Sequence, residues 1–219
     1  MPISNHIYLS ITVPASILIP LSIGIYRYKN LRGDMYTIFY YLLLNGIVNI
    51  LGVYLFSQHI NNLPVLHIFT ILEFLFVSMF YIQVLKDRKL KMLIMAMMII
   101  FPLLCMINFI YFQDIMRFNT NTRPLEALFI IAYSLMYFAQ YNEDEIDSKW
   151  MEVPSNWAST GLLLYFSGAL FIFSFSNYTS IHNIEKFKGI NTLMWNIHGT
   201  LVLFMYLLFT KGFTKCRKK

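Results

Sequence analysis

Long apolar runs alternate with short polar segments along the whole chain. The clearest run begins at Leu66 and continues for about twenty mostly apolar residues to Leu85, where a cluster of Lys and Arg residues follows. Because an α-helix rises about 1.5 Å per residue, such a run spans the roughly 30 Å hydrocarbon core of a bilayer. The pattern occurs seven times and predicts helices at about residues 7–26, 36–56, 66–85, 92–111, 124–141, 157–175 and 193–209.

We therefore expect an all-α, polytopic membrane protein, with residues 1–219 forming one bundle of seven transmembrane helices. The composition supports this expectation, since only 13% of the residues are charged and 58% are hydrophobic. About 25% of the residues of a soluble domain are charged. No Lys or Arg precedes the first apolar run, so we expect that run to be a retained helix and not a cleaved signal peptide.

The positive residues predict the orientation of this bundle. If the N-terminus lies outside, the inner loops and the C-terminal tail hold 13 of the 17 Lys and Arg residues, and the outer loops hold four, including Arg117 and Arg123. Positive loops favour the cytoplasmic side, so we predict an outer N-terminus and a cytoplasmic C-terminus. The same distribution accounts for the net charge of +6 without a nucleic-acid partner. Frequent Ile, Phe, Tyr, Asn and Lys are typical of AT-rich bacterial genomes. We expect the protein to lie in a bacterial cytoplasmic (inner) membrane.

One carboxylate, Glu73, lies in the middle of the run that begins at Leu66. A carboxylate at the centre of a bilayer costs about 2.5–3.5 kcal/mol on insertion scales, so Glu73 should face other helices or water. The predicted topology places most other polar residues of the spans in the outer half of the membrane. The candidate ligand-binding residues are Asn45, Asn49, Glu73, Asn108, Glu126, Tyr165, Trp195 and His198.

If these side chains point inward, they line a pocket that opens on the outer side. A contact between Glu73 and His198 would satisfy the polar groups of both residues. Each candidate also has a purely structural interpretation. The asparagines could join neighbouring helices by hydrogen bonds, Glu126 could stabilise a helix N-terminus, and Trp195 could anchor the chain at the membrane interface.

The sequence offers few signs of a particular reaction. It contains no HExxH spacing for zinc, no Gly-rich phosphate loop, and no lysine within an expected span that could form a retinal Schiff base. We therefore name no catalytic residue and expect no metal and no cofactor. Cys105 lies in an expected span and Cys216 in the C-terminal tail, so we expect no disulfide.

Three segments resemble a group of small bacterial seven-helix membrane proteins that has no established activity. They are IFTILEFLFVSMFY at 68–81, NWASTGLLLYFSG at 156–168, and MWNIHGTLV at 194–202 leading to GFTKCRKK at the C-terminus. The resemblance implies a seven-helix fold and transfers no catalytic role. It makes Glu73, Trp195 and His198 worth testing together.

These features favour a membrane sensor or accessory receptor that binds a small ligand or part of a lipid in an outward pocket. Signal transduction would then pass through a cytoplasmic or membrane partner, for which the acidic loop at 142–156 is a candidate docking site. A second hypothesis is a small proton-coupled transporter with Glu73 as the protonatable group. A third is an intramembrane lipid-modifying enzyme that uses Glu and His.

Overall fold

A computed structural model describes residues 7–140, 150–181 and 185–217, and in these ranges every regular element is helical. The first apolar run is broken into η1 (Tyr8–Thr12), α2 (Val13–Ala15) and α3 (Leu18–Tyr26), because Pro14 and Pro20 lack the N–H groups that a continuous helix would use. The longer helices are α4 (Gly33–Ser57), α5 (Leu63–Val84), α6 (Arg88–Tyr111), α7 (Thr122–Ala139), α9 (Pro154–Ile181) and α10 (Glu185–Lys215). Two short turns, η2 (Tyr28–Asn30) and η3 (Trp150–Glu152), lie in connections.

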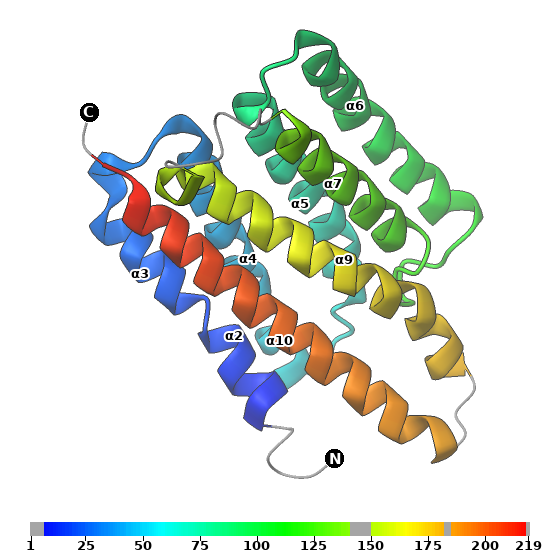
Figure 1. Cartoon of the computed structure of the whole chain (residues 1–219). Coiled ribbons are helices and arrows are strands. Elements are labelled where there is room, and N and C mark those ends of the chain that lie inside the picture. The colour runs from blue at the N-terminus through cyan, green and yellow to red at the C-terminus, as the bar shows by residue number, and fades with distance from the viewer. Residues whose placement is uncertain (1–6, 141–149, 182–184, 218–219) are drawn as a thin grey trace.

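Six helical segments are long and apolar enough to cross a membrane. They are Tyr8–Tyr26, Gly33–Ser57, Leu63–Val84, Arg88–Tyr111, Pro154–Phe175 and Gly189–Lys215. The chain is therefore a multi-pass membrane protein by helix length and hydropathy. The seventh expected span corresponds to α7, a helix of the same bundle that packs along α9 and α5 (Figure 1). It is not among the six because Arg123 and Glu126 in its first turns lower its hydropathy.

The connections gather at two opposite ends of the bundle, as Figure 1 shows. At one end, the backbone N–H of Lys86 donates a hydrogen bond to Gln140 Oε1 (2.5 Å), and Arg217 pairs with Glu152 (2.8 Å). At the other end, Asn61 Nδ2 donates to the carbonyl of Met116 (3.0 Å). We call the first the basic end and define it by residues 27–34, 85–91, 139–140, 150–157 and 211–217.

The two ends differ strongly in charge. Ten of the fourteen Lys and Arg residues in the described ranges belong to the basic end, and the other four are Arg117, Arg123, Lys186 and Lys188. Lys215 and Arg217 both bind the carboxylate of Glu152 there, at 2.6 and 2.8 Å. The hydrogen bond from Lys215, with the positive charges around it, keeps the pKa of Glu152 below its ordinary value. The acidic segment at 141–149 lies outside the described residues.

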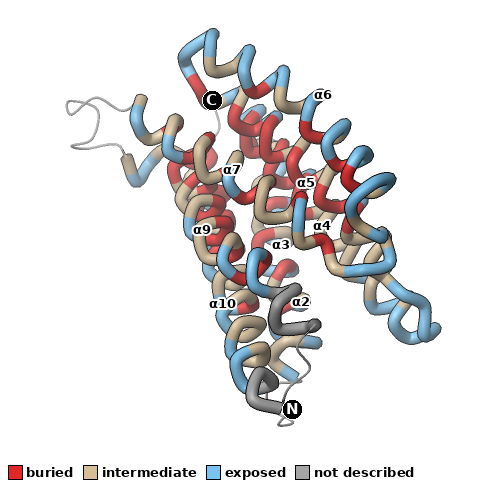
Figure 2. The backbone as a smooth tube through the Cα atoms, turned by 90° about the vertical axis from the view of Figure 1, so that its right-hand side faces the viewer, coloured by how far each residue is buried: buried red, intermediate tan, exposed pale blue. Residues whose placement is uncertain are grey.

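Apolar side chains cover the outer surface as well as the core. Figure 2 shows α6 at the edge of the bundle with an almost fully exposed outer face, where Ile99 and Ile110 are both 68% exposed. Exposed apolar surface on this scale fits contact with lipid. Inside, aromatic and aliphatic side chains fill the space between helices, and Leu42, Phe74 and Phe166 are completely buried.

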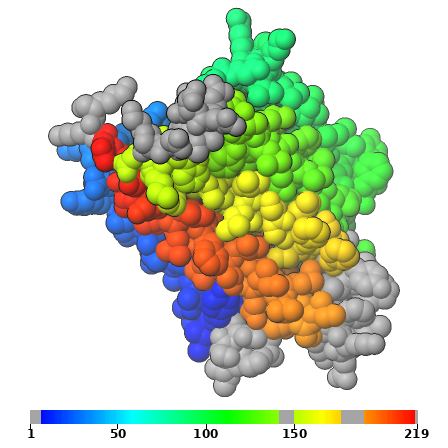
Figure 3. Space-filling model, in the orientation of Figure 1, coloured from blue at the N-terminus to red at the C-terminus, as the bar shows by residue number. Residues whose placement is uncertain are grey.

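Helices α9 and α10 lie against each other along the face seen in Figure 3. Gly161 allows their close approach in the half of the bundle nearer the basic end. A Cβ atom at this position would lie 3.3 Å from Leu208 Cβ and 3.4 Å from the carbonyl oxygen of Met205. Because one neighbour is backbone, it cannot move aside as a flexible side chain could. Close helix packing through small residues is common in membranes.

We predict that Gly161→Leu lowers the midpoint of thermal unfolding in detergent, because overpacking costs typically about 1–3 kcal/mol. Gly189→Leu is the matched control, since a Cβ there meets nothing within 4 Å. Equal unfolding temperatures for the two variants would show that α9 and α10 do not pack as described.

Candidate functional site

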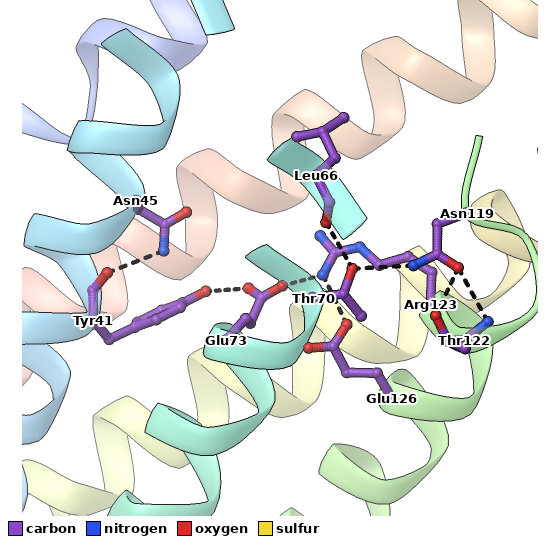
Figure 4. A network of polar contacts seen from close by, with 9 residues as sticks. All are labelled: Tyr41, Asn45, Leu66, Thr70, Glu73, Asn119, Thr122, Arg123 and Glu126. Carbon is purple, nitrogen blue, oxygen red and sulfur yellow. Dashed lines mark hydrogen bonds and ion pairs between the residues drawn. The ribbon is translucent and has the colours of Figure 1, made fainter. Parts of the chain in front are cut away.

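The site begins at the first turn of α7, which is fixed by Asn119. The Oδ1 atom of Asn119 accepts hydrogen bonds from the backbone N–H of Thr122 (3.2 Å) and from its hydroxyl (2.7 Å). The amide nitrogen of Asn119 donates to Thr70 Oγ1 on α5 (3.3 Å), and Thr70 donates to the carbonyl of Leu66 (3.0 Å). These contacts tie the start of α7 to α5, so the next residue, Arg123, enters the bundle (Figure 4).

Arg123 binds two carboxylates with one nitrogen. Its Nη1 atom donates to Glu73 Oε2 on α5 and to Glu126 Oε2 on α7, the latter at 2.8 Å (Figure 4). The other oxygen of Glu73 accepts a hydrogen bond from the hydroxyl of Tyr41 on α4 at 2.5 Å. The side chains of Glu73 and Glu126 are 2% and 0% exposed, and that of Arg123 is 14% exposed. We call Arg123, Glu73 and Glu126 the Arg123 triad.

The position of Arg123 corrects the sequence interpretation, which assigned it to an outer loop. It lies in α7 and neutralises buried charge, so it does not contribute to the charge of that loop. The misassignment arose because Arg123 directly precedes Pro124, a usual first-turn residue. The spacing of Arg123 and Glu126 could have indicated their ion pair, because residues three apart on a helix are neighbours. An intramembrane Glu73 also required a cationic or hydrogen-bonding partner.

Two aromatic rings lie close to the guanidinium group. The Cζ atom of Arg123 lies 4.7 Å from the centroid of the Phe173 ring and 5.6 Å from that of Phe69. Cation–π attraction in a site shielded from water adds to the ion pairs. The side chain is therefore fixed by charge on one side and by aromatic faces around it.

A cavity of about 230 Å³ opens beside the triad, in the half of the bundle away from the basic end. Six of the eight residues predicted to bind a ligand line it: Asn45, Asn49, Glu73, Tyr165, Trp195 and His198. The cavity is also lined by residues that were not predicted to bind a ligand, among them Tyr41, Thr70, Asn119, Arg123 and Tyr206. Helices α4, α5, α7, α9 and α10 thus all contribute polar groups to one space.

Two predicted residues do not line this cavity. Asn108 binds the α6–α7 connection: its Oδ1 accepts from Asn121 Nδ2 (2.8 Å) and its Nδ2 donates to Gln113 Oε1 (3.3 Å). Its role in the structure is therefore to hold that connection. Glu126 contacts Arg123 outside the cavity lining, and its Oε1 atom has no hydrogen-bond partner among the described residues.

His198 lies on the cavity wall among aromatic rings. Its ring centroid is 5.5 Å from those of Tyr165 and Phe173 and 5.6 Å from that of Trp195. Among the described residues, its Nδ1 atom has no hydrogen-bond partner, and no hydrogen bond joins it to Glu73. Among the described residues, Glu73 and His198 therefore do not form the pair that the sequence suggested, although both line the same cavity.

Within the described ranges, no group of three or more His, Cys, Asp and Glu side chains is placed to hold a metal ion. Comparison of the chain with protein-family models, with curated proteins and with solved structures finds no match. These comparisons therefore identify no family.

We predict that Arg123→Leu strongly destabilises the protein, because removing one partner of a buried ion pair costs about 3–5 kcal/mol. The variant leaves two carboxylates facing each other in an apolar interior. Arg117→Leu, which removes an exposed Arg six residues earlier, is the control. Unfolding followed by tryptophan fluorescence in detergent measures both. A stable Arg123→Leu variant would refute a structural role for the triad.

Proposed function

We propose that the chain is a membrane receptor that binds a small polar molecule, or the polar part of a lipid, in the cavity beside the Arg123 triad. The observation that carries this proposal is the convergence of polar side chains from five helices on one hollow within an otherwise apolar bundle. Buried polar groups in a membrane are costly and commonly mark ligand or ion sites. A cavity of about 230 Å³ has room for several water molecules or a small ligand.

The lining favours a ligand that has both apolar and hydrogen-bonding parts. The rings of Tyr165, Trp195 and Tyr206 offer apolar faces. Asn45 and Asn49 offer amide donors and acceptors one helical turn apart on α4. Pockets of this kind, with a few placed polar groups in an aromatic wall, are typical small-molecule sites.

We further propose that the cavity faces the outside of a bacterial inner membrane and the basic end faces the cytoplasm. The support is that ten of the fourteen Lys and Arg residues in the described ranges lie at the basic end, because positive loops are retained on the cytoplasmic side. The burial of Arg123 increases the difference in positive charge between the two ends of the bundle, because Arg123 does not count among the loop residues at the end away from the basic end. The N-terminus then lies outside and the C-terminus inside.

Helices α9 and α10 offer a route from ligand to partner. Both line the cavity, and both extend to the basic end, where Lys215 of α10 binds Glu152. A ligand that prefers one packing of these helices would shift their arrangement at the cytoplasmic surface. A cytoplasmic or membrane signalling partner could respond to that shift. The lipid-modifying enzyme is less well supported, because His198 and Glu73 are not hydrogen-bonded to each other.

Orientation can be tested with single cysteines in a variant that lacks Cys105 and Cys216. We expect Ile60→Cys, in the exposed α4–α5 connection, to react with a membrane-impermeant maleimide added to spheroplasts. Lys89→Cys, at the basic end, should react only after the membrane is permeabilised. The reverse pattern would place the cavity on the cytoplasmic side.

Ligand binding can be tested by filling the cavity. We expect native mass spectrometry of the protein, purified in mild detergent, to detect a bound small molecule or lipid. Val202→Phe, which adds a ring at the cavity wall, should lose this adduct. Val53→Phe makes the same change on the lipid-facing side of α4, where Val53 is 61% exposed, and should keep it. The proposal fails if neither wild type nor control carries an adduct, or if Val202→Phe retains it.

A further inference from the structure

A second polar group lies deeper in the bundle, between the Arg123 triad and the basic end. It consists of Ser78 and Tyr81 on α5, Tyr133 and Ser134 on α7, and Ser159 on α9, and we call it the hydroxyl cluster. Tyr81 and Ser134 share a hydrogen bond of 2.6 Å, and the ring centroids of Tyr81 and Tyr133 are 5.9 Å apart. All five residues are at most 2% exposed.

Three of these hydroxyls lack a partner among the described residues: those of Ser78, Tyr133 and Ser159. Buried hydroxyls in proteins nearly always have a hydrogen-bond partner, and buried water supplies it where the protein does not. Ser159 lies close to the Tyr81 hydroxyl, and Ser78 lies close to that of Tyr133. Hydroxyls so arranged can exchange hydrogen bonds with one another and with water.

The cluster continues toward the basic end through Tyr137. The hydroxyl of Tyr137 donates to Asn156 Oδ1 on α9 at 2.6 Å, and Asn156 Nδ2 donates to the carbonyl of Trp150 in η3 at 2.9 Å. Tyr137 lies one helical turn beyond Tyr133 on α7. Polar groups therefore extend from the cluster to the surface of the basic end.

In the other direction, the cluster approaches the triad. Glu126 and Tyr133 are seven residues apart on one face of α7, about 10 Å along the axis. Helical side chains lean toward the N-terminus of their helix, so the Tyr133 side chain covers part of this distance. The unpartnered Oε1 atom of Glu126 belongs to the triad, in which two carboxylates face a single guanidinium. With both carboxylates ionised the triad would carry one excess negative charge, which one added proton would neutralise.

We propose that the Arg123 triad, the hydroxyl cluster and Tyr137 form a proton-transfer path through the bundle. A proton from water in the cavity binds a triad carboxylate. Each hydroxyl or water along the path then accepts one proton and releases another, and a water molecule at the basic end takes up the last. One proton enters and one leaves, so only O–H bonds are made and broken. The path goes beyond ligand binding and does not require a ligand.

The test is proton flux in liposomes that contain the full chain, a trapped pH-sensitive dye, and valinomycin with a potassium gradient to set the voltage. Wild type should acidify the lumen faster than protein-free liposomes. Tyr81→Phe, which removes one hydroxyl, and Glu126→Gln, which removes one proton-binding group, should each reduce the flux to the protein-free rate. Tyr54→Phe is the control, since Tyr54 is 60% exposed on α4 and lies outside the path.

Ser134→Ala provides an independent variant of the cluster, and size-exclusion chromatography establishes that each variant is folded. Flux of wild type equal to that of protein-free liposomes would overturn the proposal. So would unchanged flux in Tyr81→Phe and Ser134→Ala. Because no ligand is present, a negative result leaves the native mass spectrometry of Val202→Phe unaffected, and the two proposals can fail separately.

Discussion

The pairing of Arg123 with two carboxylates is the interaction on which the rest of this site depends. In the interior of a membrane bundle no bulk water is present to solvate Glu73 or Glu126, so each requires a partner within the protein. Arg123 serves both, and Tyr41 completes the hydrogen bonding of Glu73. One guanidinium thereby joins α5 to α7, while the tyrosine brings in α4.

This cross-link also accounts for the hollow beside it. The charged groups hold α4, α5 and α7 at positions set by hydrogen-bond lengths, and the bulky rings of Phe69 and Phe173 pack on the guanidinium. The polar side chains on the remaining walls face this cavity. In a tightly filled apolar core, the same side chains would lack hydrogen-bond partners. Toward the basic end, large buried apolar side chains surround the hydroxyl cluster.

The helices could be predicted from the sequence because hydropathy over about twenty residues is a local property, strongly constrained by the bilayer. The inward position of Glu73 followed from the same constraint. Its partner did not, because a contact between α5 and α7 depends on helix order in space. Arg123 stood beside a proline in a polar segment and was interpreted as a loop residue. Asn108 could not be placed from the sequence either, since an asparagine that holds a connection and one that lines a pocket have the same sequence signature.

A double-mutant cycle on Arg123 and Glu73 tests the central pairing most directly. The free energy of unfolding in detergent is measured for wild type, Arg123→Met, Glu73→Met and the double variant. Residues in direct contact show coupling of about 0.5–3 kcal/mol, and we expect a value at the upper end for this buried pair. The double variant should therefore be much more stable than the sum of the single changes implies. Strictly additive effects would contradict the ion pair and, with it, the organisation of the cavity.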